Sequence, residues 1–409
     1  MSVKILFSIT YYHPYVSGLT LAASRWAEGL AKAGNHVSVL CMKHDRSLRD
    51  SGETPLRPAR PDFAGQVRVV RARPFLRLSK GFLSLDWVVK SWDLVRQNDV
   101  VVVNLPQFEG VIPALFARIF GKKTIAIYHC EIVTTPVIQW LMEISHMITL
   151  FLADEVVTYT RDYAHHSKLL RSLTILKKNA KITYIVPPIP KPKENKALTK
   201  RLKKKIGKTD VVIGVAARLA QEKGIEYLFE ALPIIARRVL PRVFLHSHPQ
   251  RGPRPVEVLL PASPADSVKV VIAGPMEPVG EEAYKEKIMK LVAKHNKRVV
   301  FLGSIKPEEM GSFYKLIDVL VLPSVNSTEA FGMVQVEAMR WGVPVVASDL
   351  PGVRVPVQDT GMGLVVPPKN AIQLAEAITT VLSQSRSQGK NSIYPEAQSI
   401  QALLSLIHQ

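Results

Sequence analysis

The sequence predicts an α/β protein made of two doubly wound domains, each with a parallel sheet. Short runs rich in Val and Ile recur along the chain, bounded by turn residues and separated by segments of helix length, which is typical of parallel βαβ units. The runs form two sets with a Pro- and Lys-rich stretch between them. At 409 residues and 47% hydrophobic content, the chain can build two or three domains, and we expect two.

Seven runs form the first set and predict a Rossmann-like domain over residues 1–188. Near-continuous apolar strands indicate a sheet that is covered by helices on both faces. The expected strands are Val3–Ile9, His36–Met42, Val67–Arg73, Asp99–Leu105, Thr124–Cys130, Glu155–Thr160 and Ile182–Pro187.

Six runs form the second set and predict a second Rossmann-like domain over residues 209–385. The amphipathic pattern Ala371–Leu382 predicts a surface helix near its end. A last helix at Ala397–Ile407, within residues 386–409, is expected to pack back on the first domain. The expected strands are Val211–Ala217, Val268–Gly274, Val299–Ile305, Val319–Ser324, Val343–Ser348 and Gly363–Pro367.

The formal charge of +20 is concentrated in one window. Residues 161–208 hold 15 Lys or Arg against two acids, and the dense part, Lys191–Lys208, has no interleaved aromatic residue. Proline rigidity and charge repulsion favour a basic linker at 189–208 over a base-stacking surface, so we expect no nucleic-acid partner. A non-enzymatic protein that binds nucleic acid or another anionic surface remains the alternative.

Other features of the sequence favour a cytosolic protein. The most apolar stretch, Val137–Ala153, is interrupted by Gln139, Glu143 and His146, so no membrane-spanning helix is expected. No secretory signal is visible after Met1. Cys41 and Cys130 lie in apolar runs, which predicts buried thiols rather than a disulfide or a metal site.

In open α/β sheets ligands bind beyond the carboxyl ends of the strands, so the loops that follow strands are the candidate sites. After Val319–Ser324, a segment with Ser327 and Thr328 placed to cap a helix leads into the pattern Val334–Trp341. Glu329 and Glu337 are eight residues apart, which on one helix places both carboxylates on about the same side, where they could hold two hydroxyl-bearing parts of one ligand. The alternative is an acid favoured by the helix dipole plus an ordinary surface glutamate.

Around these two glutamates, five motifs follow one another in a characteristic order: Pro323-Ser324, Glu329-Ala330-Phe331-Gly332, Glu337-Ala338-Met339, Gly342–Ala347 and Leu350-Pro351-Gly352-Val353-Arg354. This order resembles the "glycosyl transferases group 1" family of retaining enzymes, whose hallmark is Glu, seven residues, Glu. The resemblance implies the GT-B fold, in which two Rossmann-like domains face each other across a cleft. The first domain would lie on the acceptor side and the second would bind a nucleotide-sugar donor.

The resemblance also implies roles for individual residues. Glu329 would bind the donor sugar hydroxyls and Glu337 the ribose. The backbone N–H groups of Phe331, Gly332 and Met333 would face the donor, and Ile305 is assigned to the donor side as well.

Two further loops carry residues suited to phosphate. Arg218 and Lys223 follow the strand Val211–Ala217 and could bridge the oxygens of a diphosphate without a metal ion, although a solvated pair is the plain alternative. The family resemblance assigns both to the donor diphosphate. In the loop after the first strand, Gly18 would allow close approach of the donor, whereas Ser17 stands where the family usually has a second glycine.

His129 and Glu131 follow the strand Thr124–Cys130. A histidine here could bond a sugar hydroxyl or be a satisfied structural residue. The resemblance favours a positioning role for His129 beside donor sugar and acceptor, and a weaker acceptor-side role for Glu131.

Two segments have an open role. Between Arg71 and Leu83, cations alternate with apolar side chains, which could lie on an anionic membrane surface or form an ordinary exposed edge. Residues 241–266 read as an insertion, in which His246 and His248 are expected to be loop residues rather than metal ligands.

The resemblance therefore implies a metal-independent hexosyltransferase that uses a UDP- or GDP-linked sugar, with mannose or glucose favoured, on a glycan or lipid-linked acceptor in cell-envelope or polysaccharide biosynthesis. His129, Arg218, Lys223 and Glu329 would form its catalytic set. Retention would follow the same-face route, so Glu329 is expected to bind the sugar rather than attack it. A nucleotide-sugar epimerase or a phosphorylase-like enzyme of the same fold is the nearest alternative.

Overall fold

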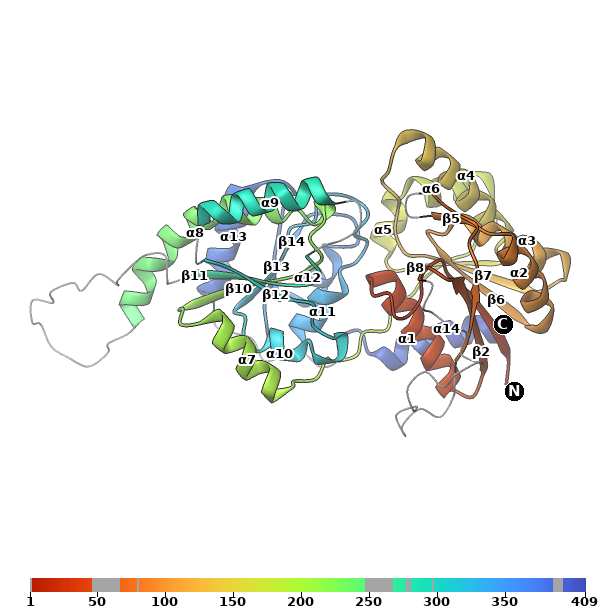
Figure 1. The fold of residues 1–409 in the computed structure, drawn as a ribbon, viewed down its shortest axis with the longest axis horizontal. Helices are drawn as coiled ribbons and strands as arrows, with labels where there is room; N and C mark the ends of the chain where they lie inside the picture. The colour runs from red at the N-terminus through yellow and green to blue at the C-terminus, as the bar shows by residue number, and fades with distance from the viewer. Residues whose placement is uncertain are drawn as a thin grey trace, which may run out of the picture. The chain divides into compact units, whose positions relative to one another are not determined.

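The computed structural model describes residues 2–45, 67–78, 81–246, 268–276, 281–295, 298–384 and 393–409. The chain divides into two compact units, Met1–Ile189 together with Tyr394–Gln409, and Pro190–Ile393 (Figure 1). Among the described helices, none is long and apolar enough to cross a membrane.

The first unit is built on a seven-stranded parallel sheet in the order β3-β2-β1-β6-β7-β8-β9. All seven expected strands are present, with ends shifted by at most a few residues. The order reverses between β1 and β6, which is the topological switch point of a doubly wound sheet. The strands are β1 (Lys4–Ser8), β2 (His36–Met42), β3 (Arg68–Ala72), β6 (Val100–Leu105), β7 (Lys123–Tyr128), β8 (Glu155–Thr158) and β9 (Ile182–Tyr184).

Helices flank this sheet, and the last helix of the chain belongs to this unit. In α14 the Ser399 hydroxyl accepts from the indole N–H of Trp26 at 3.0 Å and donates to the Val186 carbonyl at 2.6 Å, which ties α14 to α1. The helices are α1 (Gly18–Lys32), α2 (Leu85–Gln97), η1 (Phe108–Gly110), α3 (Val111–Ile119), α4 (Pro136–Leu152), α5 (Arg161–His166), α6 (Lys168–Leu176) and α14 (Glu396–His408).

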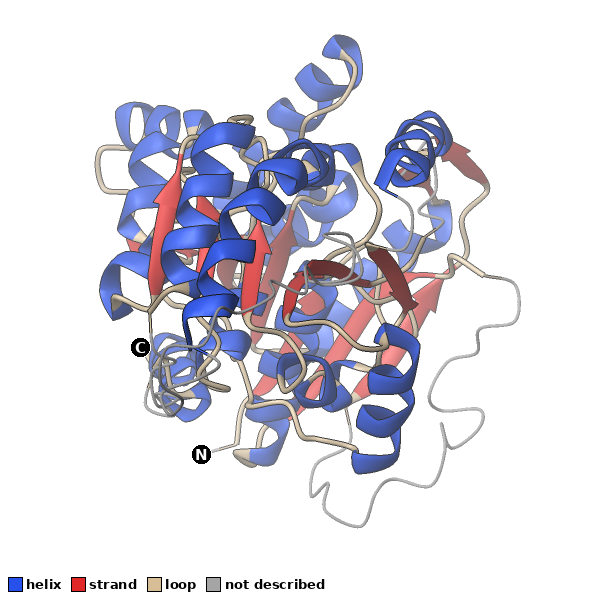
Figure 2. Ribbon diagram, turned by 90° about the vertical axis from the view of Figure 1, so that its left-hand side faces the viewer, coloured by secondary structure: helices blue, strands red, loops and turns tan. Residues whose placement is uncertain are grey.

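The second unit has a six-stranded parallel sheet in the order β12-β11-β10-β13-β14-β15, whose switch point lies between β10 and β13. All six expected strands are present, and helices lie on both faces (Figure 2). The strands are β10 (Val211–Ala216), β11 (Val268–Ala273), β12 (Val299–Gly303), β13 (Val319–Leu322), β14 (Val345–Ser348) and β15 (Gly363–Val366).

The helices of the second unit are α7 (Lys196–Ile206), η2 (Gln221–Lys223), α8 (Ile225–His246), α9 (Glu282–His295), η3 (Pro307–Glu309), α10 (Gly311–Tyr314), α11 (Met333–Met339), α12 (Val355–Thr360) and α13 (Ala371–Leu382). Two apolar cores lie on the opposite faces of its sheet. One lies under α8, α9 and α13, and the other lies under α10, α11 and α12.

The stretch expected to be a solvated linker is largely a helix. Leu198, Leu202 and Ile206 recur every four residues, and all three are buried on one side of α7, while the lysines between them are exposed. The helix begins at Asn195, whose side chain accepts from the Ala197 and Leu198 amides. The density of lysines hid this amphipathic spacing, so the expectation of a linker is wrong over residues 196–206.

The region read as an insertion also begins in a helix, because α8 continues through Pro241 to His246. His248 and residues 247–267 lie outside the described residues. Of the two thiols expected to be buried, Cys41 is buried and Cys130 is only half-buried.

Two short strands that were not expected, β4 (Leu76–Leu78) and β5 (Gly81–Leu83), pair as an antiparallel hairpin. Just before them, Arg71 is buried, and its guanidinium donates to the His13 carbonyl at 3.0 Å. The expectation that Arg71 belongs to an exposed cationic surface is therefore wrong. Lys80 lies outside the described residues.

Candidate functional site

The switch point of the second unit brings together the two loops that follow β10 and β13. The Val325 amide donates to the Glu222 carbonyl at 3.0 Å. Gly224 has a φ of +59°, and a Cβ there would lie 2.2 Å from the carbonyl oxygen of Pro323. Only glycine fits this left-handed position and this approach of two backbones, so the chain packs the loops directly against each other.

An ion pair joins the same two loops through their side chains. The Nζ atom of Lys223 lies 2.5 Å from Oε2 of Glu329, 106 residues further along the chain. Both side chains are mostly but not fully buried, with 19% and 16% exposed. The structure therefore places two of the predicted site residues, one from each loop, in direct contact.

Arg218 belongs to the same group of charges. Its guanidinium is ion-paired with Glu222, four residues later. Burial raises the pKa of the Glu222 carboxyl, but the charges of Arg218 and Lys223 and hydrogen bonds outweigh burial and hold that pKa below its usual value. The loop after β10 thus presents two cations, each held in place by a carboxylate.

The start of α11 differs from the expectation. Its N-cap is Gly332, with φ +75°, and not Ser327 or Thr328, because Thr328 instead bonds the side chain of Asn326. A Cβ at Gly332 would lie 2.6 Å from Leu322, so a larger residue does not fit. Phe331 is buried, and Met333 is the first residue of the helix.

The buried side chain of Gln335 fixes the turn at Phe331 and Gly332 by hydrogen bonds. Its Nε2 donates to the carbonyls of Phe331 at 2.8 Å and Val353 at 3.0 Å. Its side chain is fully buried, so the loop before α11 is fixed to the core of the unit.

Glu329 lies three residues before the N-cap of α11 and only Glu337 lies within the helix, so the eight-residue spacing does not place the two carboxylates on one side of a shared helix. Glu337 is buried, and its Oε2 accepts from the hydroxyl of Tyr314 at 2.9 Å. Ile305, after β12, is half-buried against the core under α11.

In the first unit, Ser17 and Gly18 form the start of α1. Ser17 is the N-cap: its Oγ accepts from the Thr20 amide, while its own amide donates to Oγ1 of Thr20 at 2.7 Å. This capping box explains a serine where the family usually has glycine. Gly18 is exposed and is the first residue of the helix, where backbone N–H groups have no partner within the helix.

The ring of His129 is 2% exposed, and both of its nitrogens have protein partners. Nε2 lies 3.0 Å from Oδ1 of Asn104, and Nδ1 bonds the hydroxyl of Tyr159. Burial lowers the pKa of His129 to about 3, so the ring is neutral at neutral pH. Both ring nitrogens of His129 are thus already bonded within the protein. This arrangement matches the alternative of a structural histidine rather than one that bonds a sugar directly.

Glu131 also has a structural contact. Its Oε1 accepts from the backbone N–H of Lys168 at 3.0 Å, at the first residue of α6, where a carboxylate is favoured by the helix dipole. The residue is half-buried.

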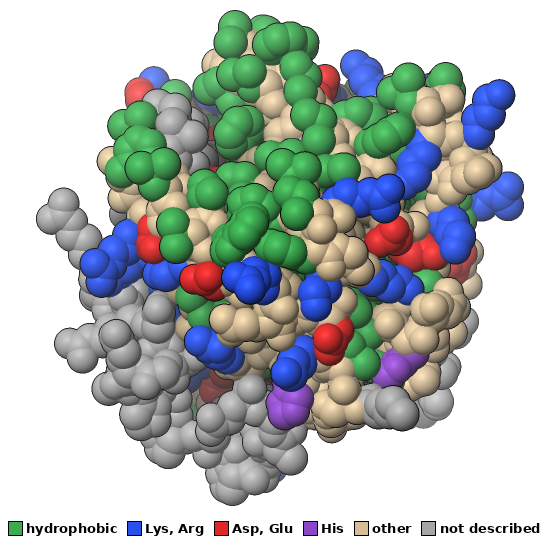
Figure 3. All heavy atoms as spheres, turned by 90° about the vertical axis from the view of Figure 1, so that its right-hand side faces the viewer, with side chains coloured by type: hydrophobic (Ala, Val, Ile, Leu, Met, Phe, Trp, Pro, Cys, Tyr) green, Lys and Arg blue, Asp and Glu red, His purple; other side chains and the backbone are tan. Residues whose placement is uncertain are grey.

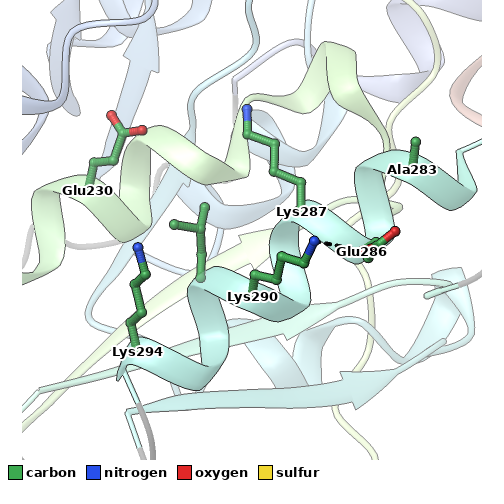
Figure 4. Close-up of a pocket in the computed structure, with 7 residues that line it drawn as sticks. Glu230, Ala283, Glu286, Lys287, Lys290 and Lys294 are labelled. Carbon is green, nitrogen blue, oxygen red and sulfur yellow. Dashed lines mark ion pairs between the residues drawn. The ribbon is translucent and has the colours of Figure 1, made fainter.

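A separate hollow of about 340 Å³ lies between α8 and α9. Lys287, Lys290 and Lys294 line it with Glu230 and Glu286 (Figure 4), and Lys290 is paired with Glu286 at 2.7 Å. None of the predicted site residues lines it, and its charges are of mixed sign on an exposed helix surface. We therefore locate the candidate site at the two loops and not here.

Sequence reasoning missed the residues that hold the candidate ones in place. Glu222 could have been found, since it stands four residues after Arg218. Tyr314, Asn104 and Tyr159 left no local signal, because each acts on a residue that is remote in sequence. Gln335 bonds Phe331, four residues earlier, and also the remote Val353.

Comparison with known proteins finds a family match in the second unit. The profile of the family described as "Glycosyl transferases group 1" matches residues 254–397. An uncharacterized glycosyltransferase of Methanocaldococcus jannaschii is 32% identical over 166 residues, which cover 41% of this chain and 34% of that protein. The match thus spans about a third of that relative. A D-rhamnosyltransferase of Pseudomonas aeruginosa is 25% identical, over 94% of this chain and 89% of its own.

Among solved structures, Anabaena HepE in complex with UDP and glucose has a TM-score of 0.68 at 18% sequence identity, and 99% of each chain is covered. At this identity the likeness concerns the fold, which is the GT-B fold that the sequence motifs implied. The profile match lies almost wholly in the second unit, where the five ordered motifs also lie, so this part of the chain is similar to the glycosyl transferases group 1 family.

Proposed function

We propose that this chain is a retaining, metal-independent glycosyltransferase. It transfers a hexose, with mannose or glucose favoured, from a UDP- or GDP-linked sugar to a glycan or lipid-linked acceptor. The observation that carries the proposal is the group of Arg218, Glu222, Lys223 and Glu329 at the switch point of the second sheet.

These residues suit a diphosphate leaving group. Cleavage of the anomeric C–O bond leaves negative charge on the diphosphate, and two cations fixed in one loop stabilise that charge without rearrangement. Arg218 offers a planar fork of donors and Lys223 a point charge. We therefore assign the neutralisation of this charge to Arg218 and Lys223.

The carboxylates serve the rest of the donor. Glu329 is held by Lys223 beside the cations, where its second oxygen can accept from sugar hydroxyls. Glu337 is assigned to the ribose, with Tyr314 fixing the orientation of its carboxylate. The backbone of Phe331, Gly332 and Met333 forms the turn that faces the donor, and Ile305 contributes an apolar contact.

We infer the same-face route to retention, in which the leaving diphosphate and the acceptor share one face of the sugar. Glu329 therefore binds the sugar and is not assigned as a nucleophile. His129 is neutral and bonded at both nitrogens, so we assign it an indirect role: it fixes the edge of the first sheet on the acceptor side, together with Glu131.

The test is a product assay with the purified chain, UDP-glucose or GDP-mannose, a set of glycan and lipid-linked acceptors, and EDTA throughout. The expected result is acceptor-dependent release of the nucleoside diphosphate and an anomeric configuration, read by NMR, that matches the donor. An inverted product or a requirement for added divalent metal would contradict the corresponding part of the proposal.

The same assay separates the alternatives. A changed sugar nucleotide without acceptor indicates an epimerase, and a requirement for orthophosphate indicates a phosphorylase-like enzyme. Steeply salt-dependent binding of DNA or RNA that survives Glu329→Ala, with no turnover, indicates a binding protein.

A further inference from the structure

Helix α4 (Pro136–Leu152) exposes its apolar stripe and buries several polar side chains. A surface helix of a globular protein normally buries its apolar stripe and exposes polar side chains. In α4 the apolar stripe is exposed at positions i, i+4, i+7, i+11 and i+14, which are Val137, Leu141, Ile144, Ile148 and Phe151. Trp140 lies beside this stripe and is 61% exposed.

The buried side of α4 holds three polar residues and one apolar residue, Leu150, and two of the polar side chains bond to residues outside the helix. Ser145 donates to the Phe108 carbonyl at 2.5 Å, and Nε2 of His146 accepts from the Gln107 amide at 3.2 Å. Thr149 is buried on the same side. These bonds fix the orientation of the helix, so the apolar stripe from Val137 to Phe151 stays on the outer side.

The neighbouring helices extend the exposed apolar surface. Helix α4 packs against α3, which exposes Leu115 and Ile119, and against α6, which exposes Ile175 and Leu176. We call the outward apolar residues of α3, α4 and α6 the outer apolar face. Figure 3 shows hydrophobic side chains gathered over much of one side of the molecule, with Lys and Arg side chains beside them. Patches of this extent mark interaction sites rather than ordinary surface.

Exposed cations adjoin the outer apolar face. Arg118 is next to Ile119 in α3, Arg171 is one turn before Ile175 in α6, and Lys178 follows Leu176 by two residues. Lys177 is anchored at the end of α4, where its Nζ donates to the carbonyls of Phe151 and Ala153. Between Lys168 and Lys181, five Lys or Arg residues occur with no acid.

We propose that the outer apolar face docks on the surface of a membrane that contains anionic lipids. Trp140 and the aliphatic stripe would enter the interfacial region, and the adjoining cations would pair with lipid headgroups. A second copy of the chain is a poorer partner, because a symmetric contact between two copies of this face would bring like charges together.

This inference goes beyond the transferase activity, because docking needs neither donor nor acceptor. It also places the membrane contact on another surface than the segment from Arg71 to Leu83. In that segment Arg71 is buried, so it cannot pair with lipid headgroups. A chain docked in this way would meet a lipid-linked acceptor at the membrane surface.

The experiment is vesicle flotation of the full chain. The vesicles are phosphatidylcholine alone or phosphatidylcholine mixed with phosphatidylglycerol. The first variant combines Trp140→Gln, Ile144→Gln and Ile148→Gln, and the second combines Arg171→Gln with Lys178→Gln. Ile372→Gln, an exposed apolar residue of α13 in the second unit, is the matched control. Circular dichroism melting verifies that each variant is folded, which is expected because the altered side chains are exposed.

We expect wild type and the Ile372→Gln control to float with the mixed vesicles and much less with phosphatidylcholine alone. The triple variant should partition at least about tenfold more weakly, because three apolar side chains no longer enter the interface. The Arg171/Lys178 variant should bind about threefold to thirtyfold more weakly at low salt.

Three results would overturn the proposal. One is the absence of wild-type flotation with mixed vesicles. Another is equal flotation of the triple variant, and the third is equal wild-type binding to neutral vesicles. If light scattering instead shows a wild-type dimer that the triple variant loses, and neither floats, the occupant of the face is a second copy and not a membrane.

Discussion

The carboxyl edges of the two sheets carry different kinds of polar groups. In the second unit, Arg218 and Lys223 are partly exposed cations; Arg218 pairs with Glu222 in its own loop, and Lys223 pairs with Glu329 in the other loop. In the first unit, His129 is buried, neutral and bonded to Asn104 and Tyr159. The edge of the second sheet is therefore suited to a charged ligand. The edge of the first sheet is held rigid by hydrogen bonds between uncharged side chains.

The largest expected effect comes from Lys223→Ala. We expect kcat/KM to fall by about 10²- to 10³-fold, as for other donors that stabilise developing negative charge. The measurement is steady-state release of nucleoside diphosphate. Lys290→Ala, which removes an exposed lysine that is also ion-paired, serves as the control and should stay within about twofold of wild type. Equal losses in both variants would remove the distinction between the loop cations and surface cations.

The packing of the two loops is tested by Gly224→Ala against Gly361→Ala. Both glycines have a left-handed backbone, but a Cβ at Gly224 would meet the Pro323 carbonyl, whereas nothing lies within 4 Å of one at Gly361. We expect Gly361→Ala to cost about 1 kcal/mol of unfolding free energy and Gly224→Ala clearly more. Thermal melting measures both, and equal costs would show that the loops are not held together at Gly224.

The neutral edge predicts a pH effect on stability. Because burial lowers the pKa of His129 to about 3, the unfolded chain binds a proton below about pH 6.5 that the folded chain does not. Stability is thus unaffected by this group above pH 6.5 and falls as the pH drops below it, by about 2 kcal/mol between pH 7 and pH 5.

Melting of wild type and His129→Gln at pH 7 and pH 5 measures this contribution. The variant should lose less stability than wild type on acidification. His146 remains in both proteins and adds a similar dependence, since burial lowers its pKa to about 4. If wild type and His129→Gln lose the same stability between pH 7 and pH 5, His129 is protonated in the folded protein at pH 5.

The smallest expected effect concerns Tyr314→Phe. This change removes the hydroxyl that donates to Glu337 and leaves the packing of the ring intact. A lost hydrogen bond is worth about 1 kcal/mol, so we expect nucleotide affinity to fall by about fivefold with little change in kcat. Calorimetric titration measures the affinity. An unchanged value would show that the Tyr314 hydroxyl does not contribute to nucleotide binding.

The sheets were predictable from the sequence because strands buried on both faces appear as continuous apolar runs. Helix α7 was not, since its three buried residues stand among lysines. The β4–β5 hairpin was missed because each strand has only three residues. In these cases, tertiary packing supplies what local patterns do not show.

The candidate site was predictable where its chemistry is local. Arg218 and Lys223 share one loop, and the ordered motifs around Glu329 and Glu337 pointed to the next. The partners of Glu329, Glu337 and His129 were not predictable, because they come from other elements of the fold. The cap of α11 was assigned to Ser or Thr because a left-handed glycine cap leaves no side-chain signal.

The most direct test of the central claim is the melting temperature with UDP, GDP and ADP for wild type, Lys223→Ala and Lys290→Ala. A ligand at about 100 times its Kd stabilises the folded state by about 2.7 kcal/mol. We predict that one of the three nucleotides raises the midpoint of wild type and Lys290→Ala by several degrees and leaves that of Lys223→Ala nearly unchanged. No shift with any nucleotide, or the same shift in Lys223→Ala, would contradict a nucleotide-diphosphate site at the two loops of the second unit.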